Sequence, residues 1–407
     1  MISKQWSLYD LQYVVLTTIL LIDFTLIQSP TFIPRLCIGS LLFISFWIPY
    51  IRRFTLPALP IFTWLITFYA CQFIPIHYRP THIFVNLLPT LERILYGANL
   101  SEIISKHTHP ILDILTWIPY GLIHFSFPFI LSILIFIFGP PGSLKTFGKA
   151  FGYMNLAGVL TQLYFPNASP WYEIIYGSAP ANYSIPGEAG GLIRIDKILG
   201  LSLYGSSFGT SPLVFGAFPS LHSGCATIEM LFVSYLFPRL KPICFIYVMW
   251  MWFSTMYLTH HYMIDLVGGS IYAILTFTIA YPFLPKRIPH YRTRMDYFGV
   301  SKSNIRTFIY SIEHEDLNND SSDINDEESA LKEIHQTTAT TRSFKRPESL
   351  KLYTINEKRI LEEEEEEENE RLPGLSPSSS SHWSFTSEPS SPITPYSSSP
   401  RMQLNKL

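Results

Sequence analysis

The chain has 407 residues, 48% of them hydrophobic, and a mean hydropathy of +0.21. A soluble protein of this length rarely averages hydrophobic, so the composition favours a membrane protein. The formal net charge of −2 gives no indication of a nucleic-acid partner. The four cysteines lie in or beside apolar runs without a Cys-x-x-Cys spacing, which is typical of buried free thiols rather than of metal or redox chemistry.

Apolar runs divide residues 1–290 into eight candidate membrane-spanning helices, each near the roughly 20 residues that a bilayer requires. They cover residues 11–29, 34–51, 57–74, 114–138, 147–165, 221–237, 242–259 and 263–283. This pattern predicts an all-α polytopic membrane protein, with N-terminal transmembrane helices in residues 1–75 and a larger helical region in residues 76–290.

Lysine and arginine in the short connecting loops predict how the helices are oriented in the membrane. With eight spans, the basic clusters all fall on the side of the two termini; they are Arg52–Arg53, Lys145, Arg239 with Lys241, and Lys286, Arg287, Arg292 and Arg294. This side is expected to be cytosolic, so the loops 75–113 and 166–220 are expected to face the lumen.

The sequence becomes polar and charged after the last apolar run. Residues Glu362–Glu368 form an unbroken acidic run, and serine and proline dominate residues 374–400. A segment of this composition buries too little apolar surface to offset its chain entropy, so residues 291–407 are predicted to form a disordered cytosolic tail. A regulatory or sorting role for the tail is the alternative to a merely solvated segment.

Two segments carry polar residues at the ends of apolar runs, where ionisable groups of a membrane protein are candidates for function. The first is residues 216–224, with Ser220 and His222, and the second is residues 254–265, with His261 and Asp265. In the predicted topology both segments meet at the lumenal face, although they are far apart in the sequence.

The residue types in these segments suit phosphoryl transfer. His261 and Asp265 are four residues apart, so on a helical turn they share a face and the carboxylate can fix the imidazole tautomer. The second ring nitrogen is then able to act as a nucleophile or a base. Ser220 stands before a helix start, where unpaired backbone N–H groups favour a phosphate, and His222 on the first turn could pass a proton to a leaving oxygen.

This arrangement resembles the phosphatidic acid phosphatase type 2 superfamily of histidine phosphotransferases. The segment Pro219-Ser220-Leu221-His222 matches the family's Pro-Ser-x-His motif. Ser254, His261 and Asp265 match the family's second motif at the spacing that it requires.

The chain departs from the superfamily pattern at two basic positions. Thr255 stands where the family usually has arginine, and Gln72 stands where an upstream motif, ending here in Arg79-Pro80, has lysine. A phosphomonoester carries nearly two charges at neutral pH, whereas a diester carries one. The missing cations therefore favour a transferase that acts on a phospholipid diester over a monoester phosphatase.

Longer strings resemble the fungal inositol phosphorylceramide synthase catalytic subunits, the aureobasidin-resistance proteins. The strings are 95–97, 151–156, 169–172, 181–184, 190–196, 216–226 and 256–262, and the similarity covers roughly residues 50–290. The resemblance implies a six-helix phosphotransferase core within residues 76–290 and transfer of inositol phosphate from phosphatidylinositol to ceramide, with release of diacylglycerol. It also implies a lumenal site in the Golgi membrane, a regulatory membrane subunit, and no metal or cofactor.

The resemblance further implies a role for each residue of the predicted site. His261 would attack phosphorus to form a phosphohistidine, and Asp265 would orient its ring. His222 would protonate the departing diacylglycerol oxygen and then deprotonate the ceramide hydroxyl. Arg194 is a candidate either for contact with the substrate phosphate or for an ion pair with Asp196.

Other readings of these residues remain open. A metal site formed by His222, His261 and Asp265 has plausible ligand types but needs more assumptions. The neighbouring His260 points about 100° away from His261 on a helix and is expected to be structural. The competing functions are a lipid phosphate phosphatase, and a non-catalytic membrane scaffold or transporter. A transporter would need polar groups at mid-span, where Asp23 is the only clear charge.

Overall fold

The computed structural model describes residues 10–300 and 305–313. Within the described residues the chain is helical, and its extended contacts are isolated bridges that pair Asn167 with Phe84 and with Gly216. The α-helices are α1 (Leu11–Leu26), α2 (Phe32–Ser45), α3 (Pro49–Thr55), α4 (Leu59–Ala70), α5 (Leu87–Tyr96), α6 (Leu100–Ser105), α7 (Pro110–Trp117), α8 (His124–Phe138), α9 (Ser143–Tyr164), α10 (Pro170–Tyr176), α11 (Leu192–Leu199), α12 (Leu203–Gly209), α13 (Leu221–Leu236), α14 (Lys241–Tyr257), α15 (Met263–Ala280) and α16 (Ile305–Glu313). The shorter turns are η2 (Cys71–Phe73), η3 (Ile76–Tyr78), the π-helix η4 (Ile118–Ile123), η5 (Pro238–Leu240), η6 (Tyr281–Phe283) and η7 (Arg294–Phe298). The all-α prediction is therefore confirmed for this part of the chain.

Helices occupy every predicted membrane span. Within the described residues, the continuous stretches Pro110–Phe138, of 29 residues, and Met263–Phe283, of 21 residues, are long and apolar enough to cross a membrane. Helices α2 and α3 qualify only as a pair, and they bend by 106° at the break between them. The prediction of one continuous span over residues 34–51 is therefore wrong, because the chain turns before Pro49, which begins a new helix.

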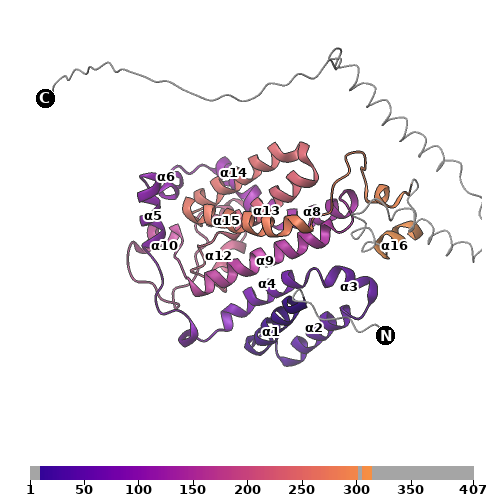
Figure 1. Cartoon of the computed structure of the whole chain (residues 1–407). Coiled ribbons are helices and arrows are strands. Elements are labelled where there is room, and N and C mark those ends of the chain that lie inside the picture. Colours follow the sequence, from indigo (N-terminus) through magenta and orange to yellow (C-terminus); the bar gives the residue numbers. More distant parts are fainter. Residues whose placement is uncertain (1–9, 301–304, 314–407) are drawn as a thin grey trace, which may run out of the picture. The chain divides into compact units, whose positions relative to one another are not determined.

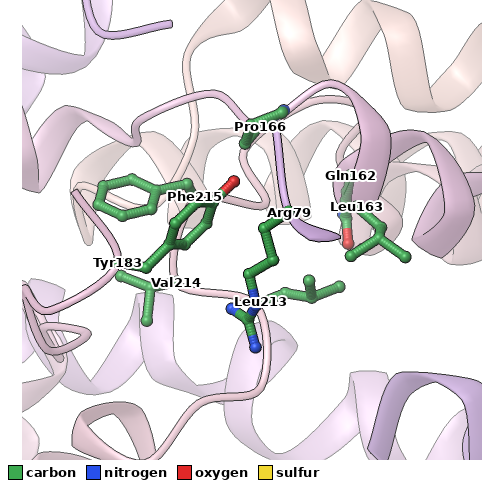
Figure 2. Close-up of a pocket in the computed structure, with 8 residues that line it drawn as sticks. All are labelled: Arg79, Gln162, Leu163, Pro166, Tyr183, Leu213, Val214 and Phe215. Atoms are coloured by element: carbon green, nitrogen blue, oxygen red, sulfur yellow. The ribbon is translucent and has the colours of Figure 1, made fainter. Parts of the chain in front are cut away.

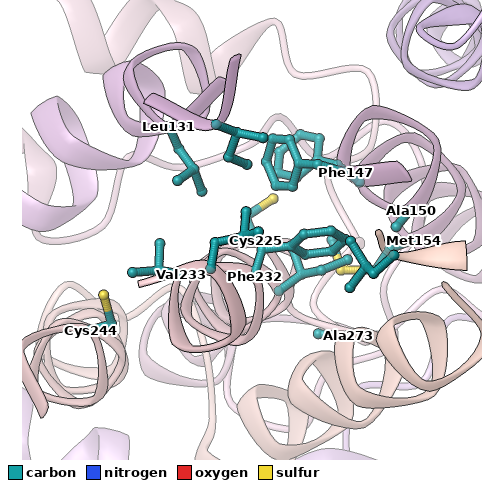
Figure 3. Close-up of a cluster of buried hydrophobic side chains, with 14 residues drawn as sticks. Leu131, Phe147, Ala150, Met154, Cys225, Phe232, Val233, Cys244 and Ala273 are labelled. Atoms are coloured by element: carbon teal, nitrogen blue, oxygen red, sulfur yellow. The ribbon is translucent and has the colours of Figure 1, made fainter. Parts of the chain in front are cut away.

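Helix α13 is the hub of the helix packing, because it contacts α8, α9, α14 and α15 (Figure 1). Its apolar face forms the main buried cluster together with side chains from these four helices (Figure 3). The rings of Phe147 in α9 and Phe232 in α13 lie 5.1 Å apart between centroids, tilted by 75°. Such edge-to-face pairs stabilise a core beyond the area that they bury. The packing therefore fixes α13 on several sides, together with the residues at its N-terminus.

Helices α13 and α15 approach each other closely where the predicted site residues begin. A Cβ atom on Gly269 would lie 2.0 Å from the carbonyl oxygen of Ser220, so a side chain at this position would separate the helices. The backbone N–H of Ser220 donates a 3.1 Å hydrogen bond to the carbonyl of Asp265, and the hydroxyl of Ser223 donates one of 2.6 Å to the carbonyl of Leu266. These contacts bring the start of α13 and the start of α15 together.

The N-terminal helices are joined to this bundle through α4, which packs against both α1 and α9 (Figure 1). Asp23 of α1 is buried and accepts a 2.7 Å hydrogen bond from the hydroxyl of Thr67 in α4. The prediction that Asp23 is the only mid-span charge is wrong, because Glu229 lies fully buried in the middle of α13. Neither carboxylate oxygen of Glu229 has a hydrogen-bond partner among the described residues.

Two short helices, η7 and α16, lie near the start of the predicted tail. Arg294 of η7 is 3% exposed and donates a 2.8 Å hydrogen bond from Nη2 to the carbonyl of Ser311 in α16. Arg53 of α3 donates to the carbonyl of Ile312 in the same helix. Both arginines satisfy carbonyls near the helix C-terminus, which have no partner within the helix. A disordered tail therefore does not begin at residue 291, and the acidic and serine-rich runs lie outside the described residues.

Candidate active site

The two predicted polar segments come together in the fold. His222 is the second residue of α13, and His261 lies in the turn between α14 and α15. Nδ1 of His222 and Nε2 of His261 are 3.1 Å apart, so one of these nitrogens donates a hydrogen bond to the other. The predicted convergence of the two imidazoles is confirmed, whereas their catalytic roles remain predictions.

Asp265 lies on the first turn of α15 and is fully buried. Its Oδ2 accepts a 3.2 Å hydrogen bond from the backbone N–H of Tyr262, the residue before the helix. Its Oδ1 lies 3.4 Å from Nδ1 of His261, which is an ion-pair distance without the alignment of a hydrogen bond. His261 precedes α15, so the capping turn, rather than the predicted shared helical face, brings the two side chains together.

The geometry of the two histidines does not favour a shared metal ion. A metal site needs ligand lone pairs that converge on one point. Nδ1 of His222 and Nε2 of His261 instead point at each other across their hydrogen bond. Among residues 10–300 and 305–313, no three His, Cys, Asp or Glu side chains are grouped so that they could hold a metal ion. The alternative of a metal site thus has no support from the geometry.

Two aromatic residues that the sequence analysis did not single out flank the ring of His222. Tyr120 in the π-helix η4 stacks on it with centroids 4.4 Å apart and planes inclined by 22°. The ring centroid of His124, at the start of α8, is 4.6 Å from that of His222. A histidine within a predicted span is a signal that could have identified this residue. π-Helical turns are frequent at functional sites, and this one presents Tyr120 to the histidine pair.

Ser220 serves as the cap of α13. Its Oγ accepts a 3.3 Å hydrogen bond from the backbone N–H of Ser223, as expected for the residue before a helix. The side chain is fully buried beneath the close approach of α13 and α15. Ser220 therefore fixes the first turn that carries His222, and a contact with phosphate remains a prediction.

Arg194 does not form the ion pair that was considered for it. Its Nε donates a 2.8 Å hydrogen bond to Oδ1 of Asp113, and its guanidinium lies 5.1 Å from the ring centroid of Tyr257. Asp196 accepts hydrogen bonds from the backbone N–H groups of Tyr204 and Gly205 at the start of α12. The predicted pairing of Arg194 with Asp196 is therefore wrong, because Asp196 caps a neighbouring helix.

Thr255, which departs from the superfamily pattern, and Arg79, which keeps the end of the upstream motif, both make contacts within the fold. The carbonyl of Thr255 accepts a 3.0 Å hydrogen bond from the backbone N–H of His260, which shapes the turn before α15. Arg79 donates to the carbonyls of Cys71 and Ile74 after α4 and lies 5.1 Å from the ring centroid of Tyr183. Figure 2 shows its guanidinium in a small pocket that Tyr183 also lines. The guanidinium of Arg79 is thus already engaged by backbone carbonyls.

His260 has the structural role expected for it. It is 5% exposed, and its Nε2 lies 3.1 Å from the carbonyl oxygen of Ala189, to which it donates as the neutral tautomer. Its ring packs against those of Tyr120 and Phe208. Burial lowers the pKa of His260 to about 3, so it stays neutral at physiological pH.

This buried neutral histidine makes stability depend on pH. Below pH 6.5, the ordinary pKa of histidine, His260 becomes protonated in the unfolded chain. In the folded chain it stays neutral down to about pH 3, so a fall in pH over this range favours unfolding. We expect His260→Gln, which keeps a donor to Ala189, to weaken this dependence by up to about 1.4 kcal/mol per pH unit. Melting temperatures measured across this range should fall less steeply in the variant; identical slopes would contradict the assignment.

Comparison with known proteins agrees with this geometry. A model of the PAP2 superfamily matches residues 88–279, which include His222, His261 and Asp265. The inositol phosphorylceramide synthase catalytic subunit aur1 of Schizosaccharomyces pombe is 51% identical over 291 residues, which are 72% of this chain and 68% of the relative. The inositol phosphorylceramide synthase of Candida albicans is 48% identical over 303 residues, 74% of this chain and 64% of the relative. The inositol phosphorylceramide synthase catalytic subunit AUR1 of Saccharomyces cerevisiae is 46% identical over 297 residues, 72% of this chain and 73% of the relative. No solved structure matches the chain. By these similarities the chain belongs to the inositol phosphorylceramide synthases.

Proposed function

We propose that this membrane enzyme transfers inositol phosphate from phosphatidylinositol to the primary hydroxyl of a ceramide and releases diacylglycerol. The observation that carries the proposal is the contact between His222 and His261, with Asp265 beside the second ring, in a chain 46–51% identical to inositol phosphorylceramide synthases. Two imidazoles at one point provide a nucleophile and a proton carrier, which are the groups that a double displacement at phosphorus needs.

In the first displacement Nε2 of His261 attacks the phosphorus of phosphatidylinositol. A bond forms between this nitrogen and phosphorus, and the bond from phosphorus to the diacylglycerol oxygen breaks. His222 donates a proton to that oxygen, so diacylglycerol leaves as a neutral alcohol. The positive charge on the phosphorylated ring of His261 is stabilised by Asp265, whose Oδ1 lies 3.4 Å from Nδ1.

The second displacement transfers the phosphoryl group to ceramide. His222, now neutral, accepts the proton of the ceramide hydroxyl, whose oxygen attacks phosphorus. The nitrogen–phosphorus bond breaks and His261 returns to its initial state, so the scheme balances without a metal or a cofactor. Tyr120 stacks on the ring of His222 with centroids 4.4 Å apart and helps to hold this ring in place for both proton transfers.

Substrate binding must first separate the two histidines. A phosphorus atom with its oxygens does not fit within a 3.1 Å hydrogen bond, so the donor lipid has to replace the contact between Nδ1 of His222 and Nε2 of His261. Hydrogen bonds between catalytic groups often rearrange when substrate arrives. The two nitrogens would then lie on opposite sides of the phosphorus, as an in-line displacement requires.

The membrane arrangement is part of the proposal. We infer eight spans, one of them formed by the bent pair α2 and α3, with both termini in the cytosol and the site at the lumenal leaflet of the Golgi membrane. The lysine and arginine clusters in the loops on the side of the two termini support this orientation. The two apolar stretches Pro110–Phe138 and Met263–Phe283 support the membrane location. Two relatives are named catalytic subunits, which supports a regulatory membrane subunit as partner of this chain.

The proposal is tested with the purified chain in vesicles that contain phosphatidylinositol labelled in the inositol ring. With ceramide present we expect labelled inositol phosphorylceramide and an equal amount of diacylglycerol, and little labelled water-soluble product. A phosphatase or phospholipase would release labelled inositol or inositol phosphate at the same rate with and without ceramide. That outcome, or a lack of ceramide product, would overturn the proposed transfer.

A further inference from the structure

The side chains of α15 cap its N-terminus only in part, because Oδ2 of Asp265 accepts from the backbone N–H of Tyr262 and leaves that of Met263 to be paired. The residue before it, Tyr262, is not a short polar residue, and its side chain makes no capping hydrogen bond. The first backbone N–H groups of a helix have no partner within the helix, and burying them unpaired is costly. A partner from elsewhere in the chain is therefore needed to hold the turn that carries His261 and Asp265.

Glu92 of α5 provides this partner. It is fully buried, and its Oε2 accepts a 2.8 Å hydrogen bond from the backbone N–H of Met263, the first residue of α15. Its Oε1 accepts one of 2.9 Å from the backbone N–H of Leu100, the first residue of α6. One carboxylate thus caps two helices that are far apart in the sequence, and its negative charge suits both helix N-termini.

A second glutamate holds the same turn from another side. Glu173 of α10 accepts a 3.2 Å hydrogen bond from the hydroxyl of Tyr262 and one of 2.8 Å from the side-chain amide of Asn99. Arg93, next to Glu92 in α5, pairs with Glu173 and balances its charge. Helices α5, α6 and α10 are therefore tied to the residues on both sides of the start of α15.

We propose that Glu92 is a positioning residue for the transfer, acting through Met263 to hold Asp265 and His261 at their working separation. The inference rests on the proposed function and deepens it. The backbone N–H of Tyr262 donates a hydrogen bond to Oδ2 of Asp265, and that of Met263 donates one to Oε2 of Glu92. Two carboxylates therefore bind consecutive amides of one turn. A shift of this turn changes the already long 3.4 Å approach of Asp265 to His261.

The ionised form of Glu92 is the one that fits these contacts. Burial raises the pKa of Glu92, and the negative charge of Asp265 acts in the same direction, whereas the backbone N–H groups lower it. Both oxygens accept from N–H donors, and a proton on either one would make that oxygen a weaker acceptor. Glutamine has the same shape but only one acceptor oxygen, and it therefore cannot satisfy both amides.

The test compares Glu92→Gln with Glu102→Gln, a matched control on α6 whose side chain is 43% exposed and pairs with Lys106. We expect Glu92→Gln to lower kcat by about tenfold to hundredfold, as small misplacements of reacting groups do, with KM for phosphatidylinositol nearly unchanged. Glu102→Gln should leave both constants at the wild-type values. A general loosening of the fold would instead lower the melting temperature and change both constants.

A second variant removes the same hydrogen bond from its other side. Met263→Pro deletes the N–H group that donates the hydrogen bond to Glu92. Proline is tolerated at the first position of a helix when the residue before it is extended, as Tyr262 is. If Glu92 acts through this amide, the double variant loses no more activity than the more impaired single variant. Additive losses, or wild-type kcat in Glu92→Gln, would overturn the inference.

Hydrogen exchange separates this inference from the proposed function. In Glu92→Gln the amides of residues 262–266 should exchange faster than in the wild type and in Glu102→Gln, whether or not the protein is supplied with lipid substrates. A wild-type protein that makes no ceramide product would refute the proposed function. Unchanged exchange in these amides would refute the positioning role of Glu92, even in an active enzyme.

Discussion

Replacing His261 with alanine is expected to lower kcat for transfer by at least about 10⁴-fold, because the variant lacks the nitrogen that bonds to phosphorus. No other imidazole in the described part of the chain approaches Asp265 as His261 does. The loss should appear in kcat, since the lipid still binds. Initial rates of labelled ceramide product, at several concentrations of phosphatidylinositol, measure the effect.

The neighbouring histidine provides the control for this experiment. His260→Gln changes a buried ring next to His261 but keeps the donor to the carbonyl of Ala189, so it should retain most of the activity. Size-exclusion profiles and melting temperatures near the wild-type values show that both variants are folded. If His261→Ala keeps substantial activity, or if the two variants lose equal activity, His261 is not the nucleophile.

Replacing His222 with glutamine is expected to lower kcat by about 10²- to 10⁴-fold, the usual contribution of a general acid and base. Glutamine cannot exchange a proton with the leaving oxygen or with the ceramide hydroxyl. The phosphorus of the donor remains open to attack by His261, so the defect lies in proton transfer. The measurement is the rate of ceramide product, as for His261→Ala.

An activated donor distinguishes the two histidines. If diacylglycerol is replaced by 4-nitrophenol, the leaving group needs no proton, and His222→Gln should release one equivalent of nitrophenol per enzyme in a burst. Ceramide product should stay slow, because the second displacement still requires a base. His261→Ala should give no burst. A burst in His261→Ala, or none in His222→Gln when the wild type has one, would reverse or remove the assigned roles.

The sequence was informative where function depends on local patterns. The polar residues at the ends of the apolar runs, together with the predicted topology, were enough to predict that His222, His261 and Asp265 lie close together. The helices also fall where the apolar runs predicted them, because backbone groups in a membrane must pair within a helix. The bend of 106° between α2 and α3 was missed, since an apolar run looks the same whether it is continuous or broken.

Contacts between distant parts of the chain could not be predicted. Arg194 pairs with Asp113, which lies 81 residues away, and no periodicity connects the two. Asp196 was the nearer carboxylate, but the orphan N–H groups at the start of α12 bind it. Glu92 was overlooked for a similar reason, because its importance comes from the amide of Met263 on another helix. A cap supplied from outside a helix leaves no mark in the helix's own sequence.

The region after the last apolar run is not uniform in composition. Nine of the twenty residues 294–313 are hydrophobic, unlike the acidic and serine-rich segments that follow them, and η7 and α16 form there. Arg294 connects the two helices through Ser311 and lies over the ring of Phe136 at a centroid distance of 4.7 Å. These contacts with α8 hold a segment whose composition differs from that of the acidic and serine-rich runs after it.

The covalent intermediate on His261 is the central claim, and trapping it is the most direct measurement. Wild-type enzyme is mixed with labelled phosphatidylinositol in the absence of ceramide and quenched in alkali, which preserves a nitrogen–phosphorus bond. Peptide mapping should find one phosphoinositol group on the peptide that contains His261, and added ceramide should remove it as labelled lipid product. Label on another residue, or an enzyme that turns over at full rate without any trapped label, would contradict the account.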